Sequence, residues 1–252
     1  MDPGLTLPAL TLALASAALH AVWNLLVARA RDVEAATAAT FVLSVAIAAP
    51  FAVIWWSAEP SVWPYALAST LLETLYVIAL AYAYRTTDLS FVYPLTRGLA
   101  PVIVLVAAGV LLVRGPEGSG GARAILVVLT IATTIAAYTL VDRVGIQHAG
   151  ALTYFVLVLA GPCLVYPPLV GAPAIRSELR APTWAAAVAN VGSFSLGLLA
   201  LRTGPAAPVL AVRSSSIVIA TLLAGRLLAE RVAPLRLAGS ALVFVGVALL
   251  AV

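Results

Sequence analysis

Apolar residues run through this chain in long stretches that are separated by short polar gaps. A transmembrane helix needs about 20 mostly apolar residues, and the chain offers nine such stretches. Because lipid supplies no hydrogen-bond partners, each stretch must satisfy its own backbone groups, so each is predicted to be an α-helix. The predicted spans are 5–28, 35–57, 64–84, 89–113, 123–141, 150–170, 182–201, 205–228 and 234–252.

Composition and charge agree with a chain that lies in a membrane. Hydrophobic residues make up 63% of the 252 residues and charged residues only 10%, whereas charged residues average about 25% in soluble domains. The arginines stand singly in the gaps, as membrane anchors do, and form no basic patch of the kind that binds nucleic acid. The sequence therefore predicts an all-α, polytopic helical bundle in the cell inner (plasma) membrane, with the lipid bilayer and no nucleic acid as its partner.

Motifs for catalysis, cofactors and metals are absent from the sequence. A single Cys and two separated His residues, His20 and His148, do not form a zinc motif. No glycine-rich nucleotide loop and no G-x-S-x-G elbow is present. We therefore expect no enzyme activity, no cofactor and no metal site.

An internal repeat relates the two halves of the chain. When Arg97 is aligned with Arg213, Glu73 and Asn190 fall at matching places, each twelve residues before an arginine at the end of its span. Repeats of this kind are typical of secondary transporters. We assign 1–114 to a first repeat of four spans, 115–122 to a linker, and the remaining residues, 123–252, to a second repeat of five spans.

Several ordered segments resemble one transporter family. They are Leu19-His20-Ala21-Val22-Trp23-Asn24, Val92-Tyr93-Pro94-Leu95-Thr96-Arg97, Ala137-Tyr138-Thr139-Leu140-Val141-Asp142 and Leu228-Ala229-Glu230-Arg231. Together they resemble the EamA family of the drug/metabolite transporter superfamily. The resemblance implies ten helices in two inverted repeats, five plus five, and export of amino acids, metabolites or drugs.

The chain departs from that pattern by about one helix. The first repeat is shorter than the second by about 21 residues, since Arg97 precedes Gly109 by 12 residues and Arg213 precedes Gly246 by 33. With four plus five spans, the halves would become parallel. The alternative is that 89–113 forms a re-entrant hairpin, which would leave the halves inverted.

Charged residues deep in a span are candidates for function because lipid makes them costly. Glu73 lies nine residues into its predicted span, and it is either a coupling or substrate-binding carboxylate or part of a structural pair. Tyr76, one turn later, lines the same side. Arg97 and Arg213 are either clamps for a carboxylate or phosphate or side chains that reach for the interface.

Polar and aromatic residues form a second set of candidates. His20, Trp23 and Asn24 share one helix face by their spacing. His20 is a candidate proton relay and Trp23 a stacking surface, while an interface anchor and a helix–helix bridge are the structural alternatives. Tyr138 aligns roughly with Trp23 in the other repeat and is expected on the opposite wall.

Two further expectations concern residues outside this candidate site. Asp142 and Arg143 fall at a predicted span end, and we expect them to form a solvated interface pair. Prolines within predicted spans are expected to kink or break their helices, with or without a role in transport. They are Pro94, Pro101, Pro162 and Pro208.

The sequence therefore favours a secondary transporter that exports a small organic metabolite or amino acid by alternating access. Proton coupling through Glu73 is a hypothesis within that interpretation. The alternative is a truncated, non-transporting membrane paralogue that acts as a structural or regulatory partner. A homodimer is compatible with both.

Overall fold

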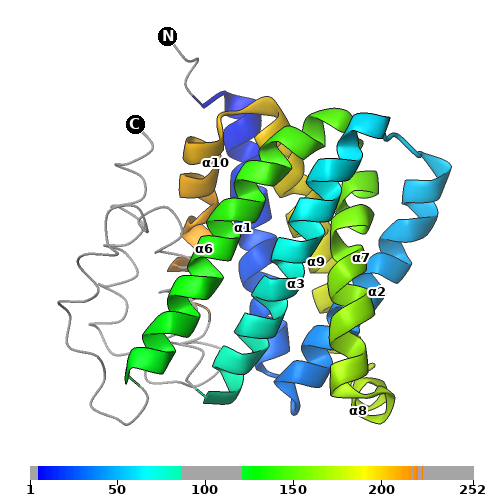
Figure 1. Cartoon of the computed structure of the whole chain (residues 1–252), viewed down its shortest axis with the longest axis vertical. Coiled ribbons are helices and arrows are strands. Elements are labelled where there is room, and N and C mark those ends of the chain that lie inside the picture. The colour runs from blue at the N-terminus through cyan, green and yellow to red at the C-terminus, as the bar shows by residue number, and fades with distance from the viewer. Residues whose placement is uncertain (1–4, 87–120, 217, 221–222, 224–252) are drawn as a thin grey trace.

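The computed structural model describes residues 5–86, 121–216, 218–220 and 223, and in this part the chain is helical without β-strands. Six long helices stand side by side along the long axis of the molecule (Figure 1). They are α1 (Leu7–Ala28), α2 (Val33–Ile54), α3 (Trp63–Thr86), α6 (Gly121–Gly145), α7 (Ala151–Val170) and α9 (Ala181–Thr203). Shorter elements are α8 (Ala172–Ser177), α10 (Ala206–Arg213), and the 3₁₀ turns η1 (Pro60–Val62) and η2 (Ile146–His148).

The outer surface of the bundle is apolar. Leu71 and Leu164 expose 70% and 75% of their surface, and each of the six long helices contains a segment long and apolar enough to cross a bilayer. Exposed Trp55, Trp56 and Trp63 gather near the turn between α2 and α3, while Trp184 lies near the start of α9 at the other end. Tryptophans at both ends are typical of the two membrane–water interfaces. The predicted helical, multi-pass membrane bundle is therefore confirmed at this level.

Six of the nine predicted spans correspond to these helices, with ends that differ by a few residues. The predicted span 205–228 is described only in part, as α10 and a few residues after it. The predicted spans 89–113 and 234–252 lie outside the described residues, as do most of the predicted linker 115–122 and the candidate residue Arg97. The count of nine spans stays a prediction.

The two described halves run in opposite directions. Helix α3 ends and α6 begins at the same end of the bundle (Figure 1). Short turns link α1 to α2 and α2 to α3, and likewise α6 to α7, so α1, α2 and α3 point opposite to α6, α7 and α9, respectively. The halves, as far as the structure describes them, are thus inverted.

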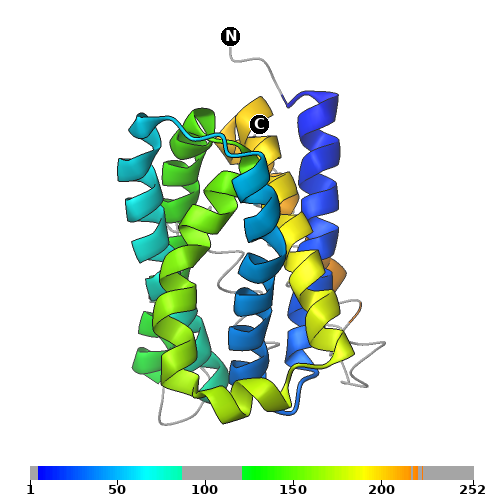
Figure 2. The same cartoon turned by 90° about the vertical axis from the view of Figure 1, so that its right-hand side faces the viewer.

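The main packing partners of the helices show the same relation between the two halves. Helix α1 packs along α9, α6 packs along α3, and α2 packs along α7. Figure 2 shows α3 and α6 on one side and α1 and α9 on the other, with α2 and α7 between them. The pairings are symmetric when each helix of one half is exchanged for its counterpart in the other, that is α1 with α6, α2 with α7 and α3 with α9. The α1–α9 pairing then becomes α6–α3, and the α2–α7 pairing is unchanged. Each outer pair therefore contains one helix from each half, and both halves border the space between the pairs.

Small residues let α1 and α9 approach closely. Ser16 donates to the carbonyl of Ser193 at 2.7 Å, and Ser193 donates back to the carbonyl of Ser16 at 3.0 Å. A methyl group added at Gly204 would lie 2.9 Å from the Cβ of Ala9. Because lipid tails are as apolar as the side chains, such close contact and interhelical hydrogen bonds hold membrane helices together.

A polar contact joins the α2–α3 and α6–α7 turns. Backbone Glu59 donates to the carbonyl of His148 at 2.8 Å, and Gly150 donates to the carbonyl of Ser57 at 2.7 Å. The His148 Nδ1 and Glu59 Oε2 atoms lie 3.1 Å apart. Hydrogen bonds with His148 and Ser61 hold the pKa of the Glu59 carboxyl below its usual value. This contact fixes the ends of α2 and α6 next to one another.

Helix α7 continues through Pro162, so of the two expected effects of this proline a break does not occur. A proline at this position has no N–H to donate to the carbonyl of Val158, four residues earlier. The Thr70 hydroxyl of α3 donates to that carbonyl at 2.7 Å and accepts from the N–H of Gly161 at 2.8 Å. A neighbouring helix thus satisfies the backbone group that the proline leaves open. Pro208 also breaks no helix, since it lies in the first turn of α10.

We expect Thr70→Val to lower the free energy of unfolding by about 1–2 kcal/mol, because two interhelical hydrogen bonds are lost at nearly constant volume. The matched control is Thr130→Val, since the Thr130 hydroxyl bonds only within its own helix, to Leu126. Unfolding of the purified protein in detergent measures both. Equal effects of the two substitutions would contradict the role of Thr70.

Candidate functional site

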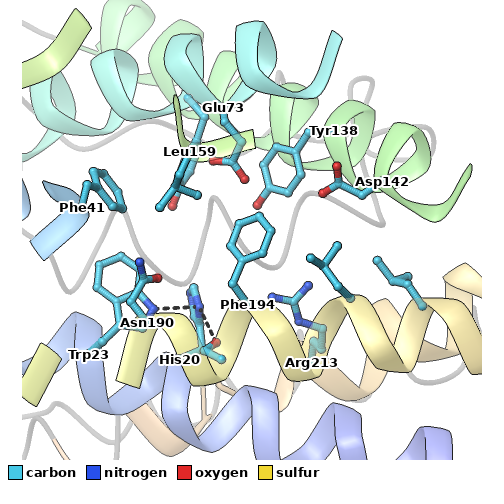
Figure 3. A pocket seen from close by; sticks show the side chains of 14 residues that line it. His20, Trp23, Phe41, Glu73, Tyr138, Asp142, Leu159, Asn190, Phe194 and Arg213 are labelled. Carbon is cyan, nitrogen blue, oxygen red and sulfur yellow. Dashed lines mark hydrogen bonds between the residues drawn. The ribbon is translucent and has the colours of Figure 1, made fainter. Parts of the chain in front are cut away.

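A small cavity lies between the two outer helix pairs. Glu73 of α3 with Tyr138 and Asp142 of α6 lie on one side, and residues of α1, α9 and α10 lie on the other (Figure 3). Its volume is about 30 Å³, which suffices for water and is far below the several hundred Å³ of a typical ligand site. The lining residues are His20, Trp23, Phe41, Glu73, Tyr76, Tyr138, Asp142, Leu159, Asn190, Ser193, Phe194, Leu198, Leu201 and Arg213.

The wall formed by α3 and α6 carries acidic and phenolic groups. Glu73 is 5% exposed and Asp142 is 2% exposed, so both carboxyls are removed from bulk water. Tyr76 and Tyr138 meet edge to face, with ring centroids 6.0 Å apart. The helical spacing of Glu73 and Tyr76 on α3, and of Tyr138 and Asp142 on α6, turns each pair toward the same space.

Asp142 is not the solvated interface residue that the sequence suggested. Its Oδ1 atom accepts a hydrogen bond from Ser69 Oγ at 2.6 Å and another from the Tyr154 hydroxyl at 3.0 Å. Gly145 allows the Tyr154 ring to approach, because a side chain at Gly145 would clash with that ring. The signal that could have found Asp142 is its place one turn after Tyr138, a residue already assigned to the cavity.

The opposite wall is built around His20 on α1. Its Nδ1 atom accepts from Trp23 Nε1 at 3.1 Å, and Ser193 Oγ of α9 lies 3.4 Å from the same nitrogen. Trp23 is 4% exposed, so it is a cavity residue and not an interface anchor. Asn190 of α9 donates to Ser44 Oγ of α2 at 3.1 Å and thereby links these two helices.

Arg213 brings the guanidinium to this wall. Figure 3 shows it below Phe194, across the cavity from Asp142, and its charge acts on the Asp142 carboxyl. Gly197 of α9 makes room for it, since a methyl group there would lie 2.8 Å from Arg213 Cζ and 3.0 Å from Ser16 Oγ. A guanidinium in this position can bind a carboxylate or phosphate in two-point fashion.

The structure thus gathers most of the candidate residues and separates one from the rest. Seven of them line the cavity: His20, Trp23, Glu73, Tyr76, Tyr138, Asn190 and Arg213. Asn24 is buried but does not line it, and its side chain donates to the carbonyl of His20 in the same helix at 2.8 Å. Among the described residues, no group of three or more His, Cys, Asp or Glu side chains gathers to form a metal site.

Arg143 does not pair with its neighbour Asp142 in water, as the sequence suggested, but crosses to α9. Its NH1 group donates to the carbonyl of Leu201 at 2.6 Å. The normal donor to that carbonyl would be residue 205, which is a proline without an N–H. A cation at the carboxyl end of a helix is also favoured by the helix dipole. Arg143 therefore holds α6 against the end of α9 beside the cavity.

Comparison with known proteins adds no name to this arrangement. The chain matches no family model and no curated protein sequence. The fold and cavity define a multi-pass helical membrane protein with a buried, charged cavity that is lined by helices of two inverted halves.

We expect Arg143→Leu to lower the free energy of unfolding by about 1.5–3 kcal/mol, because a charge-assisted hydrogen bond is lost and a helix-end carbonyl is left without a donor. Arg202→Leu is the control, since Arg202 is an exposed residue of α9. Thermal unfolding in detergent compares the two. A stability loss of equal size in Arg202→Leu would show that the contact to Leu201 is not responsible.

Proposed function

We propose that this protein is a secondary transporter of the drug/metabolite type, moving a small organic metabolite or amino acid by alternating access. The observation that carries the proposal is a buried cavity in a membrane bundle, with carboxylates on one wall and a guanidinium on the other, to which both inverted halves contribute helices. Charged groups inside a membrane protein are costly and mark substrate or ion pathways. The EamA resemblance implies the same function.

The wall chemistry favours a small zwitterion. Arg213 offers two-point binding to a carboxylate, and Glu73 offers a charge partner for an ammonium group. Trp23, Phe41 and Phe194 supply the apolar and aromatic surface that most small-molecule sites share. A solute with both charges would pair with Glu73 and Arg213 at once.

The small volume of the cavity fits one state of an alternating-access cycle. At about 30 Å³ it does not hold an organic solute, so the walls must separate for loading. Interhelical hydrogen bonds join α1, α2 and α9 on one side (Ser16–Ser193 and Ser44–Asn190) and α3, α6 and α7 on the other (Ser69–Asp142 and Tyr154–Asp142). Movement of these two groups against one another is the rearrangement we propose, with the Arg143–Leu201 contact among those that break.

Transport in proteoliposomes tests the proposal. A panel of zwitterionic amino acids and related amines is offered to vesicles that carry the protein, and uptake is compared with that of empty vesicles. We expect uptake of at least one solute, and we expect Glu73→Gln to lower its initial rate by about 10- to 100-fold, because a charge-assisted contact to the solute is lost.

The control is Glu178→Gln, a change to another buried glutamate, which lies at the α8–α9 turn away from the cavity. It is expected to transport like the unmodified protein. If uptake of every solute equals that of empty vesicles and Glu73→Gln does not change uptake, the transporter proposal fails. A non-transporting membrane partner then becomes the better interpretation.

A pair of glycines on α9 tests the role of Arg213 without altering its charge. We expect Gly197→Ala to lower the transport rate by about tenfold or more, because the new methyl group displaces the guanidinium from the cavity. In Gly192→Ala the new methyl group contacts only the flexible end of the Leu19 side chain, at 2.8 Å. The transport rate of this variant should therefore stay within about twofold of that of the unmodified protein. Equal rates in the two variants would show that Arg213 is not needed where the structure places it.

A further inference from the structure

One aromatic side chain stands inside the cavity between its charged groups. Figure 3 shows the Phe194 ring pointing from α9 across the cavity toward Tyr138, with Glu73 on one side of the ring and Arg213 on the other. The void beside the ring is only about 30 Å³, which is room for water but not for an organic solute. A solute that contacts both Glu73 and Arg213 must therefore occupy space that the ring now fills.

The Phe194 ring contacts the helix group on the other side of the cavity. Its edge-to-face partner is Phe155 of α7, with ring centroids 5.2 Å apart and ring planes at 70° to one another. Phe155 is fully buried, whereas Phe194, which lines the cavity, is only partly buried. Helices α9 and α7 belong to the two groups that, by the proposed function, move against one another. The contact between the two rings therefore crosses the boundary along which the cavity has to open.

The backbone next to Phe194 is held to α1. The preceding residue, Ser193, exchanges two hydrogen bonds with Ser16. Gly197 lies one turn after Phe194 on the same face of α9, and a methyl group there would lie 3.0 Å from Ser16 Oγ. Because this segment of α9 is fixed on α1, the ring leaves Phe155 when the two groups separate and not through a local bend of α9.

We propose that Phe194 is the gate of this cavity: its ring closes the space between Glu73 and Arg213 and limits the size of the solute that can enter. Contact with Phe155 keeps the ring in place while the two groups are together, and separation of the groups withdraws it. The inference rests on the proposed function, because it names the residue that controls access to the proposed solute site. Closure of the cavity by the ring needs no solute, however, and can be measured without one.

Reactivity of a cysteine inside the cavity tests the gate. Leu159 of α7 lines the cavity and is 2% exposed, so Leu159→Cys, made together with Cys163→Ala, places a single thiol next to the void. The reagent is 2-aminoethyl methanethiosulfonate, applied to the purified protein in lipid nanodiscs. We expect Phe194→Ala to raise the labelling rate by about tenfold or more, because removal of the ring admits water and reagent to the cavity.

Two controls separate a gate from a residue that only packs. Phe51→Ala removes the same ring at an exposed position of α2 outside the cavity and should leave the labelling rate unchanged. Val158→Cys places the thiol at a fully buried neighbour of Leu159 that does not line the cavity, and its labelling should stay slow when Phe194 is replaced. Phe194→Leu, which keeps an apolar side chain, takes the place of Phe194→Ala if the alanine variant does not fold.

Equal labelling rates of Leu159→Cys with and without the Phe194 ring would overturn the inference. So would an equal acceleration at Leu159→Cys and Val158→Cys, because the ring would then stabilise the helices without closing the cavity. In the uptake assay, Phe194→Ala should also raise the rate for leucine relative to glycine by about tenfold, and an unchanged ratio would contradict the size limit. Absence of uptake in every variant would refute the transport proposal and leave the labelling rates to decide on the gate.

Discussion

Lipid offers no hydrogen-bond partner, and this constraint explains where several buried polar groups of the described helices lie. Thr70 reaches from α3 to satisfy the carbonyl that Pro162 leaves open, and Arg143 reaches from α6 to do the same for the carbonyl opposite Pro205. Ser16 and Ser193 exchange hydrogen bonds across the closest helix pair. Because isolated charges in lipid are equally costly, Glu73, Asp142 and Arg213 lie in the interior and line one cavity.

The inverted arrangement of the two halves brings these buried polar groups together in one cavity. Because α1 packs on α9 as α6 packs on α3, the polar faces of the two outer pairs point toward a common centre. One pair contributes His20 and Trp23 with Asn190, and the other contributes Glu73, Tyr138 and Asp142. The walls are chemically different although the helices correspond, so two similarly arranged halves yield a cavity with two unlike walls.

The sequence predicted the helices well because each apolar run must span the same thickness, and it found Glu73 because a deep carboxylate is conspicuous. It misplaced Asp142 and Arg143, since nearness to a span end was taken to mean contact with water. Their burial depends on Tyr154, Ser69 and the end of α9, which are far away in sequence. The partner of the carbonyl that Pro162 leaves open could not be predicted either, because it lies on another helix.

Sidedness tests the central claim, that these helices cross a bilayer and enclose the cavity between them. Cys163 is the chain's single cysteine and is replaced by alanine, after which Ser61→Cys or Ser177→Cys is introduced at exposed positions at opposite ends of the bundle. In sealed vesicles of uniform orientation, a membrane-impermeant thiol reagent should label one of these cysteines, and permeabilisation should expose the other. Labelling of both in sealed vesicles would contradict the account.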